Sequence, residues 1–476
     1  MSSVVETSRR SKGRGLILTA LLLSSTAALP HAAQAQAPFS APDRAFQGQV
    51  RFSSAAPGKP VLPGAEVVAT GEGFHAGQTV RLLHGATPIT ADVIADAKGG
   101  FETRFTLPAD AAAGIHPLVV VSPAPYGATL AELKVSPDLP VAGAERYDIR
   151  RGAAARGLYQ TAYSAKNKAV FVTSAIGRPP VRESELLKMD AQTLAIQARA
   201  TPAAAPSRQG RSGETVEGGV YAVYGVGVDD VHDTVWTTNS RQNTVAVYRQ
   251  SDLSLVRQFA PDTVNHARDV VVDQTRNKAY ASATFEPEVV VFDTAKTEVA
   301  RRIEIASGKR GQRFSAASLS LNAAAGRLYV VSNSTNEVAV IDTAADKVLK
   351  VLPVPGARGA IGVSNDPKTG RIFVAAQGSD NVVVLDGETG AVVADTPVGA
   401  GALNVVFDPA ARQAFVANRG ASTIAVLDAD GKLLANVGGA PQANHVAADN
   451  AGVIYAVTKG GEQDNANTVW RIKARR

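Results

Sequence analysis

Three observations in the amino-acid sequence predict an all-β fold, a seven-bladed β-propeller preceded by a small immunoglobulin-like β-sandwich. First, an aromatic residue recurs inside a short apolar run at Phe171, Trp236, Tyr280, Tyr329, Phe373, Phe415 and Tyr455. Second, most of these positions lie about 40 to 50 residues apart, the period of a propeller with one four-stranded sheet per blade. Third, a separate group of short alternating runs precedes the repeat, over residues 38–137.

The composition is typical of a folded protein with more than one domain. The chain has 476 residues, of which 45% are hydrophobic and 19% are charged, and this length exceeds that of one ordinary domain. There is no cysteine, which excludes disulfides, thiolate catalysis and cysteine-bound metal centres. The formal net charge is +6, a weak argument for nucleic-acid binding over so long a chain.

Residues 1–37 are typical of an export signal. Four basic residues at positions 9–14 precede an apolar stretch at 16–29, and small residues at 33–37 offer cleavage sites. The apolar stretch is too short to span a bilayer comfortably. We therefore expect a signal peptide over 1–37 and a mature protein in the periplasm, with no membrane insertion after signal removal. Both the general secretory and the twin-arginine routes stay open.

Residues 38–137 predict the small β domain. Runs such as QTVRLL and GGFETRFTLP alternate in the manner of strands and are divided by Gly and Pro turns. Roughly seven short strands in about ninety residues favour an immunoglobulin-like sandwich, and the phrase GEGFHAGQTVRLL resembles common bacterial modules of that kind. We expect a spacer or docking module, with adhesion as the alternative. Residues 138–143 follow as a linker, which its proline makes fairly stiff.

Residues 144–476 carry the repeat. In residues 358–398, four strand-like runs are separated by turn residues, and the aromatic of the second run is expected in the core. The last repeat ends at its third run, NTVWRIKARR. The strand-like segment 144–150 is therefore predicted to return and complete the last blade, because closure removes free sheet edges.

Two sequence patterns resemble a known family. NEVAVIDTAADKVLKVLPV, preceded by RLYVVSN, looks like the YVTN-type propeller repeat. GLYQTAYSAKNKAVFVTS and ANHVAADNAGVIYAVTKG resemble the YncE-like periplasmic proteins. The resemblance covers about residues 144–476; it implies a periplasmic propeller and no particular activity, and the immunoglobulin-like domain is an addition to it.

The repeats differ in length, and the longer ones predict a binding face. Extra residues occur at 176–185, 198–219, 308–313 and 459–467. All four insertions fall in loops between the second and third strands or between blades, which emerge on one face of a propeller. Loops on a rigid scaffold carry function, so we expect the ligand at this face.

Three arginines begin blades near the expected channel mouth: Arg156, Arg268 and Arg358. A guanidinium group pairs bidentately with carboxylate or phosphate, so the three predict a site for an anionic ligand. Alternatively, the arginines hydrogen-bond neighbouring loops.

Aligning the predicted first strands gives one equivalent position per blade, with the residues Gln160, Gly225, Asp269, Ser318, Gly362, Asn404 and His445. Asp269, Asn404 and His445 complete the predicted ligand-binding set. In an alternative interpretation, these three converge on a metal, as in lactonases with propeller architecture. In the simplest one, they face a water-filled channel.

The sequence contains no GxSxG elbow and no Walker A motif. No catalytic residue and no cofactor are predicted. The leading interpretation is a non-enzymatic periplasmic binding or interaction protein, expected as a monomer. Its partner would be an anionic small molecule, a peptide or a protein. The alternatives are a metal-assisted, lactonase-like hydrolase and single-stranded nucleic-acid binding by the basic loops, which predicts steep weakening with salt.

Overall fold

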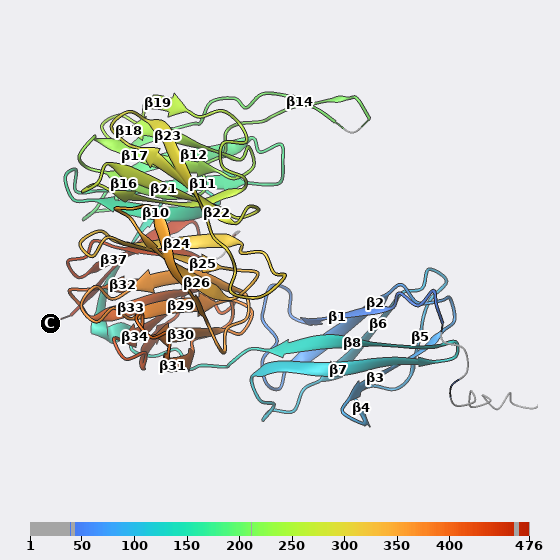
Figure 1. Ribbon diagram of the computed structural model, residues 1–476. Helices are drawn as coiled ribbons and strands as arrows, with labels where there is room; N and C mark the ends of the chain where they lie inside the picture. Colours follow the sequence, from blue (N-terminus) through green and yellow to red (C-terminus); the bar gives the residue numbers. More distant parts are fainter. Residues whose placement is uncertain (1–38, 40–42, 211, 461–465, 476) are drawn as a thin grey trace, which may run out of the picture.

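In the computed structural model the chain forms two β domains (Figure 1). The structure describes residues 39, 43–210, 212–460 and 466–475. The expected signal peptide over 1–37 lies outside these residues. The all-β fold is confirmed: the described part contains strands and one short 3₁₀ turn, η1 (Ala144–Arg146). No helix in this part is long and apolar enough to cross a membrane.

The small domain consists of two antiparallel sheets around a shared core. One sheet contains β1 (Gln49–Ser54), β2 (Glu66–Glu72) and β6 (Phe101–Thr106). The other contains β4 (Thr87–Pro88), β3 (Thr79–His84), β7 (Gly114–Pro123) and β8 (Tyr126–Val135), with β5 (Val93–Ile94) paired to β3. Ala69 and Phe101 of the first sheet pack against Val80, Leu82 and Val120 of the second. Alternate residues of β2 are buried, as in a strand with one face on the core.

Seven four-stranded antiparallel sheets make up the described part of the second domain. The first three contain β10 (Leu158–Ser164), β11 (Ala169–Ile176), β12 (Glu183–Asp190) and β13 (Ile196–Ala200); β16 (Val226–Asp229), β17 (Thr234–Asn239), β18 (Thr244–Arg249) and β19 (Leu255–Gln258); and β20 (Ala267–Asp273), β21 (Lys278–Ala283), β22 (Glu288–Asp293) and β23 (Glu298–Glu304).

The next three contain β24 (Ala316–Asn322), β25 (Arg327–Ser332), β26 (Glu337–Asp342) and β27 (Lys347–Pro353); β28 (Ala360–Asn365), β29 (Ile372–Ala376), β30 (Asn381–Leu385) and β31 (Val392–Pro397); and β32 (Ala402–Asp408), β33 (Gln413–Asn418), β34 (Thr423–Asp428) and β35 (Leu433–Val437). The last contains β36 (Ala443–Ala448), β37 (Val453–Thr458), β38 (Thr468–Ala474) and β9 (Tyr147–Ala153). A hairpin of β14 (Arg208–Gln209) and β15 (Thr215–Val216) projects from the ring on the side of the small domain (Figure 1).

The first strands of successive sheets lie side by side, and β36 of the last sheet lies beside β10 of the first, which closes a ring. Neighbouring sheets pack face to face: Trp236 of β17 lies against Phe292 of β22, with ring centroids 5.4 Å apart. Every residue of β17 is buried, because that strand is covered on both faces. We call the face formed by the turns between second and third strands the upper face, and the opposite one the lower face.

The ring closes through β9, which is the outer strand of the last sheet. β9 pairs antiparallel with β38 from Tyr147 opposite Ala474 to Ala153 opposite Thr468. The strand begins at Tyr147 rather than at residue 144, because residues 144–146 form the turn η1 after Gly143, whose φ is 83°. Tyr147 is buried against Phe415 of the preceding sheet, so the side chain also joins two sheets.

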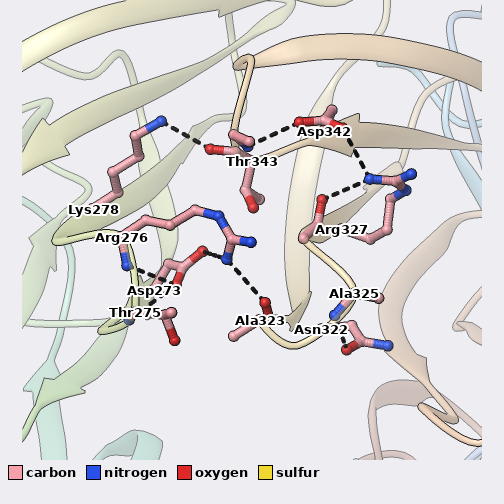
Figure 2. A network of polar contacts seen from close by, with 12 residues as sticks. Asp273, Thr275, Arg276, Lys278, Asn322, Ala323, Ala325, Arg327, Asp342 and Thr343 are labelled. Atoms are coloured by element: carbon pink, nitrogen blue, oxygen red, sulfur yellow. Dashed lines mark hydrogen bonds and ion pairs between the residues drawn. The ribbon is translucent and has the colours of Figure 1, made fainter.

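Side chains in and beside the turns on the lower face hydrogen-bond to the next sheet, and Figure 2 shows one such group of contacts. Asp273, at the end of β20, accepts hydrogen bonds from the main-chain N–H of Arg276 and from its Nη1, at 3.2 and 2.9 Å. The same Nη1 donates to the carbonyl oxygen of Ala323 in the next sheet's turn, at 2.9 Å. Lys278 Nζ similarly donates to Thr343 O at 2.8 Å. Such pairs hold the sheets in register around the ring.

The small domain docks on the upper face through Asp380, in the turn between β29 and β30. Its carboxylate accepts hydrogen bonds from Lys134 Nζ, Ser136 Oγ and the main-chain N–H of Gly401, each at 2.7 Å. The Asp380 side chain is only 2% exposed, so the ion pair to Lys134 is shielded from water on that side. The predicted linker 138–143 also contacts the ring, since Ala142 pairs with Asn436 through main-chain hydrogen bonds.

We predict that Asp380→Asn loosens the contact between the two domains. The change removes the charge that pairs with Lys134 and should lower the free energy of unfolding by about 1–3 kcal/mol. Asparagine tolerates the positive φ of 58° at this position. Small-angle scattering should show a larger radius of gyration and urea denaturation a lower midpoint. Glu132→Gln, which breaks an exposed ion pair to Arg358, should change stability by less than about 1 kcal/mol. Unchanged scattering and stability for Asp380→Asn would contradict the prediction.

Candidate functional site

The channel at the centre of the ring is shaped by β-bulges. In six of the seven first strands, the pairing with the second strand shifts register near its upper end. A bulge of this kind re-aims a side chain. The bulge occurs at or just before the position that is equivalent between repeats in the sequence alignment. Residues at this position, such as Asp269 and His445, therefore line the channel.

Polar side chains at this position tie four of the seven first strands to the next one. Four main-chain N–H groups donate to a side chain of the preceding sheet: Val226 to Gln160 Oε1 at 3.1 Å, Leu319 to Asp269 Oδ2 at 2.9 Å, Val446 to Asn404 Oδ1 at 2.8 Å and Thr161 to His445 Nδ1 at 3.4 Å. The last of these joins the final sheet to the first. We call Gln160, Asp269, Asn404 and His445 the channel ring.

Glycine occupies the equivalent position in two sheets because the next strand comes very close. A Cβ atom on Gly225 would lie 2.6 Å from the carbonyl oxygen of Arg268, and one on Gly362 would lie 2.8 Å from Asn404 Cα. Such distances are below any normal van der Waals contact. Six of the seven equivalent positions, four polar residues and two glycines, therefore have a structural cause that is independent of any ligand.

Two cavities occupy the channel on either side of the ring. The larger, of about 530 Å³, opens towards the lower face and is lined both by apolar side chains such as Val228 and Leu321 and by polar ones such as Asn365. The smaller, of about 160 Å³, opens towards the upper face, and we call it the mouth cavity. Gln160, Asn404 and His445 line both cavities.

The mouth cavity is cationic. Three arginines line it: Arg268 of β20, Arg241 in the turn after β17, and Arg419 in the turn after β33. The remaining lining residues are Tyr159, Gln160, Tyr224, Ser240, His266, Ser318, Leu403, Asn404, Asn444 and His445. Among the described residues, no carboxylate lines the cavity. Concave sites lined by one sign of charge concentrate the field and attract the opposite ion.

Arg268 lies deepest among these cations. Its Nε atom is buried and has no hydrogen-bond partner among the described residues. Burial lowers the pKa of the Arg268 guanidinium, with the nearby Asp269 carboxylate opposing this effect. An arginine still keeps its charge under physiological conditions. A buried donor without an acceptor is costly, so an anion beside Arg268 would be stabilised there.

Tyr159 and Tyr224 form the wall next to Arg268, and Lys459 packs on Tyr159 without lining the cavity. Lys459 Nζ lies 3.4 Å from the centroid of the Tyr159 ring, a cation–π contact. Burial lowers the pKa of Lys459, and a hydrogen bond with Tyr159 opposes this. Tyr159 in turn contacts Tyr224 edge-on, with centroids 4.7 Å apart. A further positive charge thus lies next to the flat aromatic surface of the wall.

His266 forms part of the opposite wall. Its ring stacks on Phe285 at a centroid distance of 4.1 Å, and Phe285 is 59% exposed at the rim. Burial lowers the pKa of His266, and the charges of Arg241 and Arg268 lower it further. The imidazole therefore contributes a neutral, hydrogen-bonding surface.

His445 forms part of the floor of the mouth cavity, and Asp269 lines the larger cavity below it. Burial lowers the pKa of His445 to about 3, with a further contribution from Arg268, so the ring is neutral at pH 7. Because Nδ1 accepts from Thr161 N–H, the proton is assigned to Nε2, which is left as a donor. Burial raises the pKa of Asp269, while hydrogen bonds from Leu319 N–H and the charge of Arg268 oppose the increase.

The structure brings together four of the six predicted ligand-binding residues, namely Arg268, Asp269, Asn404 and His445. Arg156 instead lies in a separate surface hollow, 4.0 Å from Glu183. Arg358 forms a bidentate ion pair with Glu132 of the small domain, at 3.0–3.2 Å. Arg358 thus hydrogen-bonds a neighbouring group, as in the alternative interpretation, whereas Arg156 has only the 4.0 Å contact with Glu183.

Strand register explains the difference between the three arginines. The first ladder pairs are Leu158 with Ser174, Ala267 with Ala283, and Ala360 with Ala376. Arg268 follows its paired residue and falls inside the bulge, whereas Arg156 and Arg358 precede theirs. Both precede a glycine with positive φ, so their side chains lie outside the channel.

Sequence reasoning missed Arg241 and Arg419 and treated Lys459 only as part of a loop insertion. All three follow the second strand of their sheets at the upper face. The signal was in the repeat: AFVANRG and IYAVTKG each place a basic residue directly after the strand.

The alternative metal site has little support in the donor geometry. No group of three or more histidines and carboxylates suited to a metal occurs in the described part of the chain. Moreover, Asn404 Oδ1, His445 Nδ1 and Asp269 Oδ2 already accept main-chain hydrogen bonds. Metal binding through these atoms would break contacts that join the sheets.

Comparisons with known proteins bear on the fold alone. No protein-family model and no curated protein matches the sequence. Among solved structures, hydrazine synthase of Kuenenia stuttgartiensis matches with a TM-score of 0.53 and 14% identity, over 67% of this chain and 96% of that one. The U3-55K structure matches with a TM-score of 0.53 and 10% identity, over 68% and 98%.

Virginiamycin B lyase of Staphylococcus aureus matches with a TM-score of 0.51 and 11% identity, over 69% of this chain and 100% of that one. These neighbours are β-propeller-like folds with varied roles. They support the propeller character of the ring, but at this low sequence identity they say nothing about its activity.

The pKa of His445 predicts a pH-dependent stability. An unfolded histidine has a pKa of about 6.5, whereas His445 stays neutral down to about pH 3 in the fold. The unfolded state therefore binds the extra proton, and the free energy of unfolding falls as the pH drops below about 6.5. His445→Gln can keep the bond to Thr161, and it should reduce the loss between pH 7 and pH 4.5 by about 2 kcal/mol in urea denaturation.

The exposed His84 of the small domain offers the control, because His84→Gln makes the same substitution outside the channel. An identical pH profile for His445→Gln and the parent would show that His445 is not a buried neutral group.

Proposed function

We propose that the protein is a non-enzymatic binding protein whose mouth cavity holds a small anionic group. We also infer that the seven sheets are the blades of one YVTN-type, YncE-like propeller, that the small domain is immunoglobulin-like, and that the protein works in the periplasm. The last inference rests on the sequence of residues 1–37.

The observation that carries the proposal is the buried Nε of Arg268, which has no hydrogen-bond partner among described residues, in a cavity without a lining carboxylate. A carboxylate or phosphate oxygen bound beside the guanidinium would compensate its buried charge and meet the charges of Arg241 and Arg419. His445 Nε2–H offers a further donor from the floor. Charge-assisted bonds of this kind are stronger than those between neutral groups.

The size of the mouth cavity limits what can enter it. Its volume is about 160 Å³, close to the roughly 150 Å³ of an engineered cavity that holds benzene. A carboxylate with a few attached carbon atoms fits, and so does inorganic phosphate. A nucleotide exceeds this volume, so the single-stranded nucleic-acid alternative would have to place only a phosphate group in the cavity.

Calorimetric titration of the full chain with succinate, N-acetylalanine and inorganic phosphate tests the proposal. We expect at least one of them to bind, and Arg268→Gln to weaken it by about 10- to 100-fold, since a hydrogen bond to a charged group contributes about 1.5–3 kcal/mol. Arg156→Gln and Arg358→Gln are matched controls, because both side chains are paired elsewhere, and they should bind as the parent does.

The proposal fails if none of the three compounds binds, or if Arg268→Gln binds as tightly as the parent. Equal losses in all three arginine variants would point to a diffuse effect of surface charge instead of a site at Arg268.

A further inference from the structure

A second hollow lies next to the mouth cavity, between the two domains. This second hollow, of about 410 Å³, is lined by Gly58, Gln377, Gly401, Arg419, Gly420 and Gln442, and we call it the interdomain cleft. Arg419 lines both the cleft and the mouth cavity. A ligand anchored beside Arg268 can therefore extend past Arg419 towards the small domain.

The small domain supplies one wall of the cleft and is held in place next to it. Gly58 belongs to the small domain, and the other lining residues belong to turns and connections of the ring's upper face. Lys134 of β8 donates to Gln377 O at 2.9 Å as well as to Asp380. The docking contact and the cleft thus share one turn, so the width of the cleft is fixed by the domain interface.

The chemistry of the cleft differs from that of the mouth. Its described lining contains one charged residue, Arg419, two glutamines and three glycines. Neither the Gln377 nor the Gln442 side-chain amide is hydrogen-bonded to a described residue, although the main chain of both residues is. A primary amide offers a donor and an acceptor, the pair that a peptide group also presents. Glycines let a second backbone approach closely.

We propose that the ligand is the carboxyl-terminal segment of a peptide or protein. The α-carboxylate would lie beside Arg268 in the mouth cavity, and the preceding residues would run past Arg419 along Gln377 and Gln442. A carboxylate at the end of an extended amide chain matches a cationic pocket beside a cleft that is lined by amides and a single arginine. This inference rests on the proposed anion site.

An acidic oligosaccharide is the competing occupant. The described lining of the cleft has no aromatic side chain, so a sugar ring would find no flat surface there. A peptide main chain needs only the hydrogen-bonding groups that the cleft provides. The peptide is therefore the occupant that these residues favour.

Calorimetric titration of the full chain with three probes tests the inference: tetra-alanine with a free carboxylate, the same peptide with a terminal amide, and N-acetylalanine. We expect tetra-alanine to bind about 10-fold more tightly than N-acetylalanine, because only the peptide reaches the cleft. Its amide form should bind at least 10-fold more weakly, because the anionic end is lost.

Gln377→Ala combined with Gln442→Ala should weaken tetra-alanine about 10-fold and leave N-acetylalanine unchanged, while Gln192→Ala, on an exposed turn away from the cleft, should change neither. A thermal melt and the unchanged N-acetylalanine affinity show that the double variant is folded. Arg268→Gln should weaken both probes.

Equal affinities for tetra-alanine and N-acetylalanine, with no effect of the double variant, would overturn the peptide inference and leave the anion site intact. If the double variant binds tetra-alanine as tightly as the parent does but binds tetragalacturonate more weakly, the cleft is assigned to a sugar. If neither tetra-alanine nor N-acetylalanine binds, the mouth cavity is not a carboxylate site, and the peptide inference fails with it.

Discussion

The hydrogen bonds of the channel ring are the constraint on which the second domain depends. A ring of separate sheets has no hydrogen-bond ladder from one sheet to the next, so other contacts must set their spacing. Gln160, Asp269, Asn404 and His445 each accept a main-chain N–H from the neighbouring first strand. Because these acceptors are buried, losing one would leave a buried N–H unpaired, at a cost of about 1–3 kcal/mol.

The same constraint gives the channel its chemistry. The acceptor atoms of the channel ring point towards the neighbouring first strand and bind its main-chain N–H groups. The groups left for a ligand at the upper end are therefore mainly hydrogen-bond donors. These are the guanidinium of Arg268, Nε2–H of His445 and the cations of the surrounding turns. At the lower end, valines of the first strands and several polar side chains line the larger cavity, and no arginine or lysine is among its described lining residues. One row of side chains thus separates two halves of different character.

The sequence predicts the elements of the fold better than their side-chain directions. A periodic aromatic in a short apolar run needs a sheet on each side, which is why the repeat predicts stacked sheets. The equivalent channel positions could be aligned for the same reason. Arg156 and Arg358 were misplaced because they lie four residues before the aligned channel positions Gln160 and Gly362, whereas Arg268 directly precedes Asp269. The docking of Lys134 on Asp380 joins residues too distant in the chain to be paired by pattern.

Bromide soaking of crystals, with diffraction data collected at the bromine absorption edge, tests the central claim most directly, since anomalous scattering locates bound anions without assuming a ligand. The account predicts a strong peak in the mouth cavity beside Arg268, within reach of His445 Nε2. Peaks confined to exposed arginines such as Arg156, with none in the mouth cavity, would contradict it.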